Sequence, residues 1–126
     1  MNLIIKKKKR SQLISEARKK NKIESRKTES FYEVLKKAKA PKIIDYLSLD
    51  VEGAEYEIFK NFPFNKYKFM SMTIERPPKK LNNLLFNNGY LFVKNYKVDG
   101  FYIHKSLKNK EKIRFEKFFQ IGKKKW

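Results

Sequence analysis

Apolar residues in the central part of the chain recur at two spacings, one typical of helices and one typical of buried strands. Ser30 and Glu33 have the pattern of a capping box. From Ser30 to Pro41 the apolar residues recur every three or four positions, which predicts a helix. The run IIDYLSLDV that follows is too short and too apolar for a surface helix. It predicts a strand buried on both faces, as in a parallel sheet.

The same two spacings continue towards the C-terminus. Ala54, Ile58 and Phe62 recur every four positions and predict a short helix. A proline pair, Pro77–Pro78, opens another helix, and Gly89 stands where a helix commonly ends. Three further strands are predicted at residues 69–75, 90–95 and 101–106. The last two are joined by the short turn VDG, which makes them antiparallel.

The predicted order, helix–strand–helix–strand–helix–strand–strand, is typical of an α/β fold. We expect a mostly parallel sheet with a C-terminal antiparallel hairpin and helices on both faces, formed by residues 28–106. Residues 1–27 are rich in Lys and low in complexity, and predict a weakly ordered segment. Residues 107–126 predict a basic C-terminal helix or tail, with apolar positions at Leu107, Ile113, Phe118 and Phe119.

The formal net charge of +19 on 126 residues raises the question of a polyanionic partner. The excess lies on the flanks, because residues 1–42 carry +11 and residues 107–126 carry +6, whereas residues 43–106 carry only +2. Only five of the 32 basic residues are Arg, and Lys, Asn, Ile, Phe and Tyr are all abundant. An AT-rich genome produces that bias without functional demand. A nucleic-acid-binding module with aromatic stacking surfaces therefore stays an alternative that we do not favour.

Several classes of protein are excluded or disfavoured by composition. The chain has no cysteine, which excludes disulfides and thiolate metal sites. No apolar run approaches the roughly 18 residues of a membrane span, so we expect no membrane partner. The start MNLIIKKKKR places an apolar patch before its charges, the wrong order for a secretory signal. We expect a cytoplasmic protein.

Carboxylates gather where the first two predicted strands end. Asp50 and Glu75 would lie at the carboxyl ends of neighbouring parallel strands, the edge at which open α/β sheets bind ligands. Glu52, two residues after Asp50, points the same way while the chain stays extended. Gly53 allows a tight turn and the close approach of a ligand. Glu55 falls in the first helical turn, where a negative charge is favourable, and we interpret it as a helix-start residue.

The stretch IDYLSLDVEGAEYEIFKNFPFNKYKFMSMTIE resembles part of the FkbM-type methyltransferases, which are S-adenosylmethionine-dependent enzymes with a Rossmann-like class I fold. The features that match are the Asp-x-Glu-Gly-x-Glu run at residues 50–55, the connector rich in Phe and Tyr, and a following strand that ends in Ile-Glu. LLFNNGYLFVKNYKVDGFYIHKS is similar to that family's last helix and terminal hairpin, so the resemblance covers roughly residues 28–106.

The resemblance implies S-adenosylmethionine as cofactor and, as acceptor, the hydroxyl of a sugar or another small metabolite. Asp50 and Glu75 would be the catalytic residues, because a carboxylate beside the acceptor can orient the hydroxyl or accept its proton. Asp50, Glu52 and Gly53 would contact the cofactor. Glu52 and Arg76 would contact the acceptor, Arg76 through an acidic group. A hard cation held by Asp50, Glu52 and Glu75 is conceivable, but nothing in the sequence demands a metal.

The chain departs from the family where the donor would bind. The resemblance implies a Gly-rich turn after the first strand, yet the first glycine of this chain is Gly53. We therefore expect a truncated enzyme that lacks its donor-binding half, with an inactive remnant as the alternative. The strand at residues 43–51 would then be an unpaired sheet edge, to be covered by a partner chain, by a second copy or by the apolar residues 2–5. His104, the single histidine, is interpreted as structural.

Overall fold

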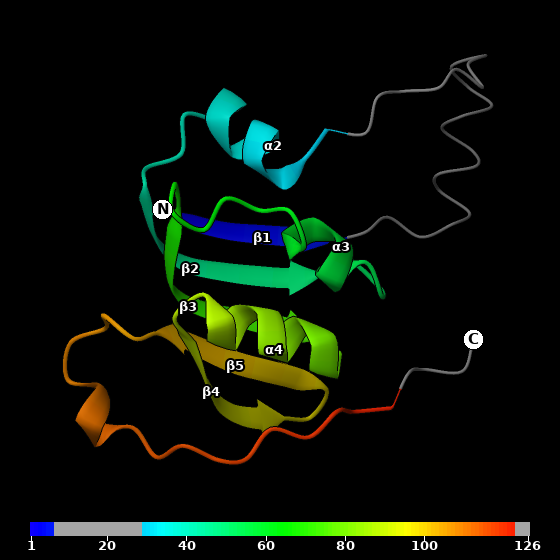
Figure 1. The fold of residues 1–126 in the computed structure, drawn as a ribbon, viewed down its shortest axis with the longest axis vertical. Coiled ribbons are helices and arrows are strands. Elements are labelled where there is room, and N and C mark those ends of the chain that lie inside the picture. The colour runs from blue at the N-terminus through cyan, green and yellow to red at the C-terminus, as the bar shows by residue number, and fades with distance from the viewer. Residues whose placement is uncertain (7–28, 123–126) are drawn as a thin grey trace.

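A five-stranded sheet in the order β1-β2-β3-β5-β4 organises the chain (Figure 1). The computed structural model describes residues 1–6 and 29–122. The strands are β1 (Asn2–Lys6), β2 (Ile43–Asp50), β3 (Lys68–Glu75), β4 (Tyr90–Tyr96) and β5 (Asp99–His104). The helices are α2 (Phe31–Lys37), α3 (Glu55–Phe59), α4 (Lys79–Asn87) and the 3₁₀ helix η1 (Lys110–Lys112).

The strand directions confirm the predicted mixed sheet. β1, β2 and β3 pair in parallel, whereas β5 lies antiparallel between β3 and β4. The hairpin turn is shorter than predicted, because β5 already begins at Asp99 and only Lys97 and Val98 connect the two strands. Lys97 has a φ of 54°, the left-handed conformation that such a tight connection needs.

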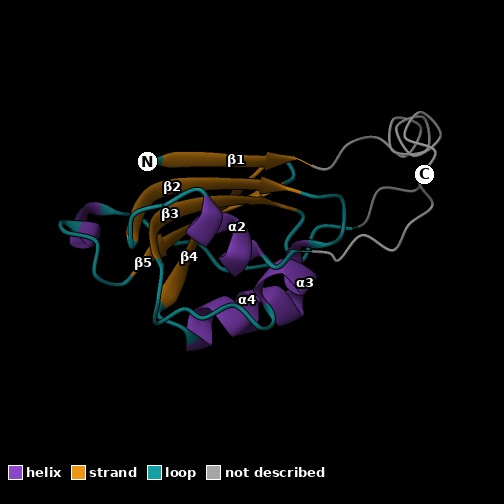
Figure 2. Ribbon diagram, turned by 90° about the horizontal axis from the view of Figure 1, so that it is seen from above, coloured by secondary structure: helices purple, strands orange, loops and turns teal. Residues whose placement is uncertain are grey.

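The helices α2, α3 and α4 lie on the same face of the sheet (Figure 2). Parallel crossovers are right-handed, and the chain steps in one direction from β1 through β2 to β3, so the connecting helices fall on one side. The predicted helices on the second face are not found among residues 1–6 and 29–122. No helix of this described part is long and apolar enough to cross a membrane.

β1 covers the edge of β2, as the apolar residues 2–5 suggested. Leu3 lies opposite Leu47 and Ile5 opposite Leu49, and both β1 side chains pack against the core. Ile4 points the other way and is 68% exposed. The edge of the sheet has therefore moved outward by one strand, from β2 to β1.

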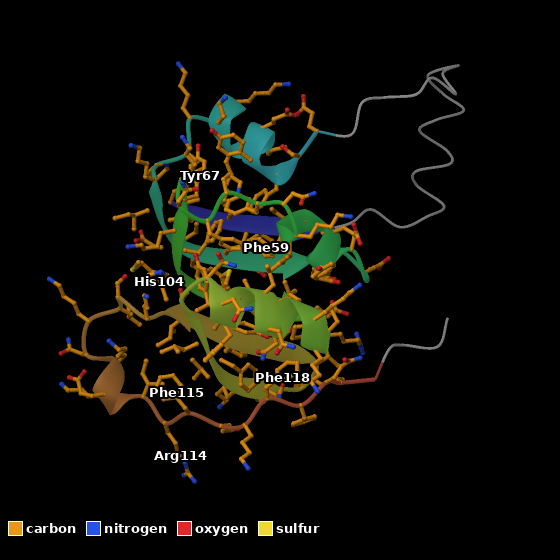
Figure 3. The ribbon with its side chains drawn as sticks, in the orientation of Figure 1. Phe59, Tyr67, His104, Arg114, Phe115 and Phe118 are labelled. Carbon is orange, nitrogen blue, oxygen red and sulfur yellow. The ribbon has the colours of Figure 1, made fainter. Side chains whose placement is uncertain are left out.

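An aromatic cluster joins α2 and α3 to the sheet. Phe31 of α2 stacks on Phe69 of β3 with ring centroids 6.0 Å apart, and it meets Phe62 at 5.4 Å. Phe59 of α3 contacts both Phe31 and Phe69 edge-on, and its side chain is fully buried (Figure 3). These rings fix α3, and with it the turn that precedes α3, against the end of the sheet.

Of the two forms expected for residues 107–126, a helix or a tail, the described residues up to 122 take the form of a tail with one short helical turn. Only η1 is helical, and residues 113–122 run without regular secondary structure along the edge strand β4. The backbone N–H of Glu116 donates to Val93 O at 2.8 Å, and Phe118 packs edge-on against Phe92 with centroids 5.2 Å apart. Contacts with β4 thus replace the helix that periodicity alone indicated.

The aromatic cluster predicts a large stability effect at Phe59. Phe59→Ala should lower the free energy of unfolding by about 3–5 kcal/mol, because it removes a fully buried ring and leaves a cavity. Phe86→Ala is the matched control, since the Phe86 side chain is 66% exposed, and it should change stability by no more than about 0.5 kcal/mol. Urea denaturation followed by circular dichroism measures both. Similar losses in the two variants would contradict this account of the core.

Candidate functional site

Three carboxylates form a row across β2, β3 and β5 at one end of the sheet. Glu75 lies directly opposite Asp99. Asp50 follows Leu49, and Glu75 follows Ile74, the residue paired with Leu49, so Asp50 and Glu75 are neighbours across the two strands. Asp99 joins them because β5 runs antiparallel and begins where β2 and β3 end. We call these three residues the acidic row.

Sequence reasoning missed Asp99. It assigned Asp99 to a turn, and a turn does not indicate which strand lies beside it. The missing information was that β5 pairs with β3, which brings an acid at the start of an antiparallel strand to the carboxyl ends of its parallel neighbours.

The acidic row changes the protonation of its central member. Hydrogen bonding to Asp50, together with burial and the negative charge of Asp50, raises the pKa of Glu75 to about 7, although the Arg76 guanidinium opposes the shift. Burial also raises the pKa of Asp99, with the charge of Asp50 adding to the effect. A carboxyl group that gains and loses its proton near neutral pH is able to act as a general base or acid.

Arg76 is held beside the acidic row by its backbone. Its φ of 44° is left-handed, and its N–H donates to Val98 O at 2.8 Å, which ties the end of β3 to the hairpin turn. The guanidinium Nη1 pairs with Glu75 Oε1. Nε is buried and has no hydrogen-bond partner within the described residues. The guanidinium therefore keeps a donor that is not used by the chain around it.

The turn between β2 and α3 contains the other predicted site residues. Glu52 and Gly53 both have positive φ, 50° and 98°, and both are exposed. Glu55 is only 2% exposed, and its Oε1 accepts from the Gly53 N–H at 3.2 Å. The carboxylate of Glu55 therefore closes the turn at the start of α3, in agreement with its interpretation as a helix-start residue.

A cleft of about 350 Å³ lies between this turn, the start of α4 and the C-terminal segment. It brings together the predicted residues Glu52, Gly53, Glu75 and Arg76, whereas Asp50 is not among its lining residues and reaches it only through Glu75. The remaining lining residues are Glu55, Tyr56, Glu57, Pro78, Lys80, Gln120 and Ile121. None of these seven was predicted to bind a ligand.

His104 lies at the other end of the sheet. It is paired with Tyr90 and stands beyond Ile103, which is opposite Ser71 near the start of β3 (Figure 3). Its Nδ1 accepts from the Ser106 N–H at 3.1 Å, its ring packs edge-on against Tyr90, and burial and the nearby Lys68 and Lys105 lower its pKa. These contacts agree with a structural histidine that is remote from the cleft.

The sequence also raised a metal site at the carboxylates and polyanion binding by the Lys-rich flanks. Among residues 1–6 and 29–122, no group of three His, Asp or Glu side chains is arranged to hold a metal ion. Most of the Lys-rich N-terminal segment, residues 7–28, lies outside the described residues.

The raised pKa of Glu75 predicts a pH-dependent effect of Glu75→Gln. A folded-state pKa of about 7 against an ordinary 4.5 means that the folded chain binds the extra proton, so stability falls as pH rises from about 4.5 to 7. The Gln side chain does not ionise, so the substitution removes this loss of stability. The variant should be more stable than the wild type by about 2–3 kcal/mol at pH 8, with a difference close to zero at pH 4.

Glu111→Gln is the matched control, because Glu111 is exposed in η1 and outside the acidic row. Urea denaturation at a series of pH values measures both variants. A Glu75→Gln effect that is constant with pH, or that matches Glu111→Gln, would show that the row does not share protons.

Comparison with known proteins adds a family to this geometry. Residues 3–92 match the family model described as the methyltransferase FkbM domain. No curated protein and no solved structure matches the chain. The matched region begins in β1 and ends in β4, so it includes β1, which the resemblance at residues 28–106 left out, together with Asp50, Glu52 and Glu75. It spans 90 of the 126 residues, and the chain therefore belongs to the FkbM methyltransferase domain family.

Proposed function

We propose that this chain supplies the acceptor side of an S-adenosylmethionine-dependent O-methyltransferase. The acceptor would be a hydroxyl group of a sugar or another small metabolite. The observation that carries the proposal is the position of Glu75, which lines the cleft, pairs with Arg76 and has a pKa raised to about 7 beside Asp50, in a domain of a methyltransferase family. A methyl-transfer site has a donor side and an acceptor side, and the residues of this chain suit the acceptor side only.

The residues present fit the donor poorly. Family membership implies S-adenosylmethionine, whose nucleotide part would need a backbone that approaches closely after β1. The residues that follow β1 in the sequence are Lys7, Lys8, Lys9 and Arg10, and residues 1–52 contain no glycine. We therefore propose that the donor-binding half is supplied from outside residues 1–126.

The acceptor side can be derived from this chain's own groups. With its pKa of about 7, Glu75 is deprotonated in about half of the molecules at neutral pH. A hydroxyl that enters the cleft can donate to the deprotonated Glu75 carboxylate and lose its proton to it as the oxygen becomes a nucleophile. Arg76 holds Glu75 in place through Nη1 and lines the same cleft.

Donor binding should require complementation. Isothermal titration calorimetry with S-adenosylmethionine should show binding when this chain is joined to a donor-binding half, that is, the Gly-rich first-strand unit of a complete FkbM-family enzyme. Asp50→Asn should weaken that binding by about tenfold, equivalent to about 1.4 kcal/mol. Asp45→Asn, on the same strand but exposed, is the matched control and should leave it unchanged. If neither the chain nor its complemented form binds the cofactor, the chain is an inactive remnant.

Methyl transfer in the complemented protein should depend on Glu75. Glu75→Gln should lower kcat by about 10²-fold or more, the usual contribution of a positioned base. Because the base must be deprotonated, the wild-type rate should rise with pH through about 7 and then level off. Transfer of a radiolabelled methyl group to a panel of monosaccharides measures both, and Glu57→Gln, in the cleft lining but paired with Lys60, serves as the control. A rate that does not change with pH between 5 and 9 would exclude Glu75 as the base.

A further inference from the structure

We infer that residues 116–121, here called the tail segment, form an acceptor-selecting wall of the cleft, with Gln120 as anchor and Ile121 as the surface that contacts the ligand. That the ligand is a methyl acceptor rests on the proposed function, whereas the presence of the wall does not. The tail segment lies outside residues 3–92, the part of the chain that the family match covers. Its role is therefore a property of this chain and is not implied by family membership.

Three anchors at alternate residues hold the tail segment in place. Glu116 N–H donates to Val93 O at 2.8 Å, where the register of β4 against β5 shifts and leaves room for an outside partner. The Phe118 ring packs on Phe92. Gln120 Oε1 then accepts from the Lys79 N–H at 3.0 Å. A backbone hydrogen bond, an aromatic contact and a side-chain hydrogen bond thus attach the tail segment to β4 and to the start of α4.

Gln120 provides a hydrogen-bond acceptor for the start of α4. The residue before this helix is Pro78, which offers no side-chain cap. Its carbonyl accepts from the N–H groups of Leu81 and Asn82, which leaves the N–H of Lys79 without a local acceptor among the described residues. Gln120 supplies one from 41 residues away in the sequence. The start of α4 and the tail segment are thus joined at the mouth of the cleft, and Ile121 follows directly as a lining residue.

The cleft lining combines two kinds of surface, which points to the kind of ligand it selects. It contains the carboxylates Glu52 and Glu75 together with the apolar side chains of Ile121 and Pro78. Tyr56 adds an aromatic ring, with Lys80 Nζ 4.3 Å from its centroid. A saturated ring with hydroxyls on its edge and C–H groups on its faces matches this combination. Ile121 would set how wide such a ring can be.

The absence of cysteine from the chain allows a direct test. A single cysteine is introduced as Tyr56→Cys on the cleft lining, and its labelling rates with N-cyclohexylmaleimide and N-ethylmaleimide are compared. The cyclohexyl reagent carries a saturated six-membered ring, whereas the ethyl reagent is small. Ile121→Trp in this background should narrow the cleft and lower the ratio of cyclohexyl to ethyl rates by about tenfold. Gln120→Ala should release the wall and raise the ratio.

Phe119→Trp is the matched control, because Phe119 belongs to the same segment but is 62% exposed and absent from the cleft lining. It should leave the ratio within twofold of the Tyr56→Cys parent. Glu52→Cys, at an exposed lining position, replaces the reporter if Tyr56→Cys does not fold. Equal ratios in Ile121→Trp, Gln120→Ala and Phe119→Trp would contradict the proposal that the tail segment forms a wall of the cleft.

The outcome is independent of methyl transfer. A changed ratio in a protein whose complemented form binds no S-adenosylmethionine would support the wall and contradict the proposed function. An unchanged ratio in a protein whose complemented form binds the cofactor would contradict the wall and support the proposed function. Thermal unfolding of the same variants separates the wall from a purely structural role, since lost stability alone would raise both labelling rates together.

Discussion

The parallel register between β2 and β3 is the constraint on which the rest of the structure depends. Leu49 and Ile74 are opposite each other and almost fully buried, so burial of these two side chains fixes the alignment of the strands. Because side chains alternate along a strand, the next residue on each strand must point away from Leu49 and Ile74. Those residues are Asp50 and Glu75. The hydrophobic core thus forces two like charges together, and the antiparallel return of β5 adds Asp99 beside them.

This arrangement costs stability, and the chain offsets the cost only in part. Like charges directly opposite each other destabilise a sheet, and the pKa of Glu75 rises in response. Arg76 neutralises one carboxylate, but it does so from a left-handed backbone conformation and with a buried Nε that lacks a partner in the described part of the chain. Three departures from local rules at one end of the sheet, beside a cleft, are typical of functional sites and would be hard to explain as features of a scaffold alone.

The sequence was informative where a pattern was local. Apolar spacing located β2, α3, β3, α4 and the hairpin, and the end of each parallel strand placed Asp50 and Glu75 at one edge. It was uninformative where the decisive partner is distant in sequence. Asp99 gains its meaning only from pairing with β3, and Gln120 only from the N–H of Lys79. The same holds for residues 113–122, whose apolar positions fit a helix equally well until β4 offers Phe92 and Val93 as partners.

The topology also bears on where a second substrate could bind. Open α/β sheets hold nucleotides at a switch point, where the strand order reverses and helices change faces. In the described residues the parallel strands step one way from β1 to β3, and α2, α3 and α4 share one face, so the cleft beside Glu75 is not at such a point. A reversal would require further strands beyond β1, which is the edge strand among the described residues and where Ile4 is largely exposed. Under the proposed function, that edge is the place at which a donor-binding half would complete the sheet, with the acidic row and the cleft on the acceptor side.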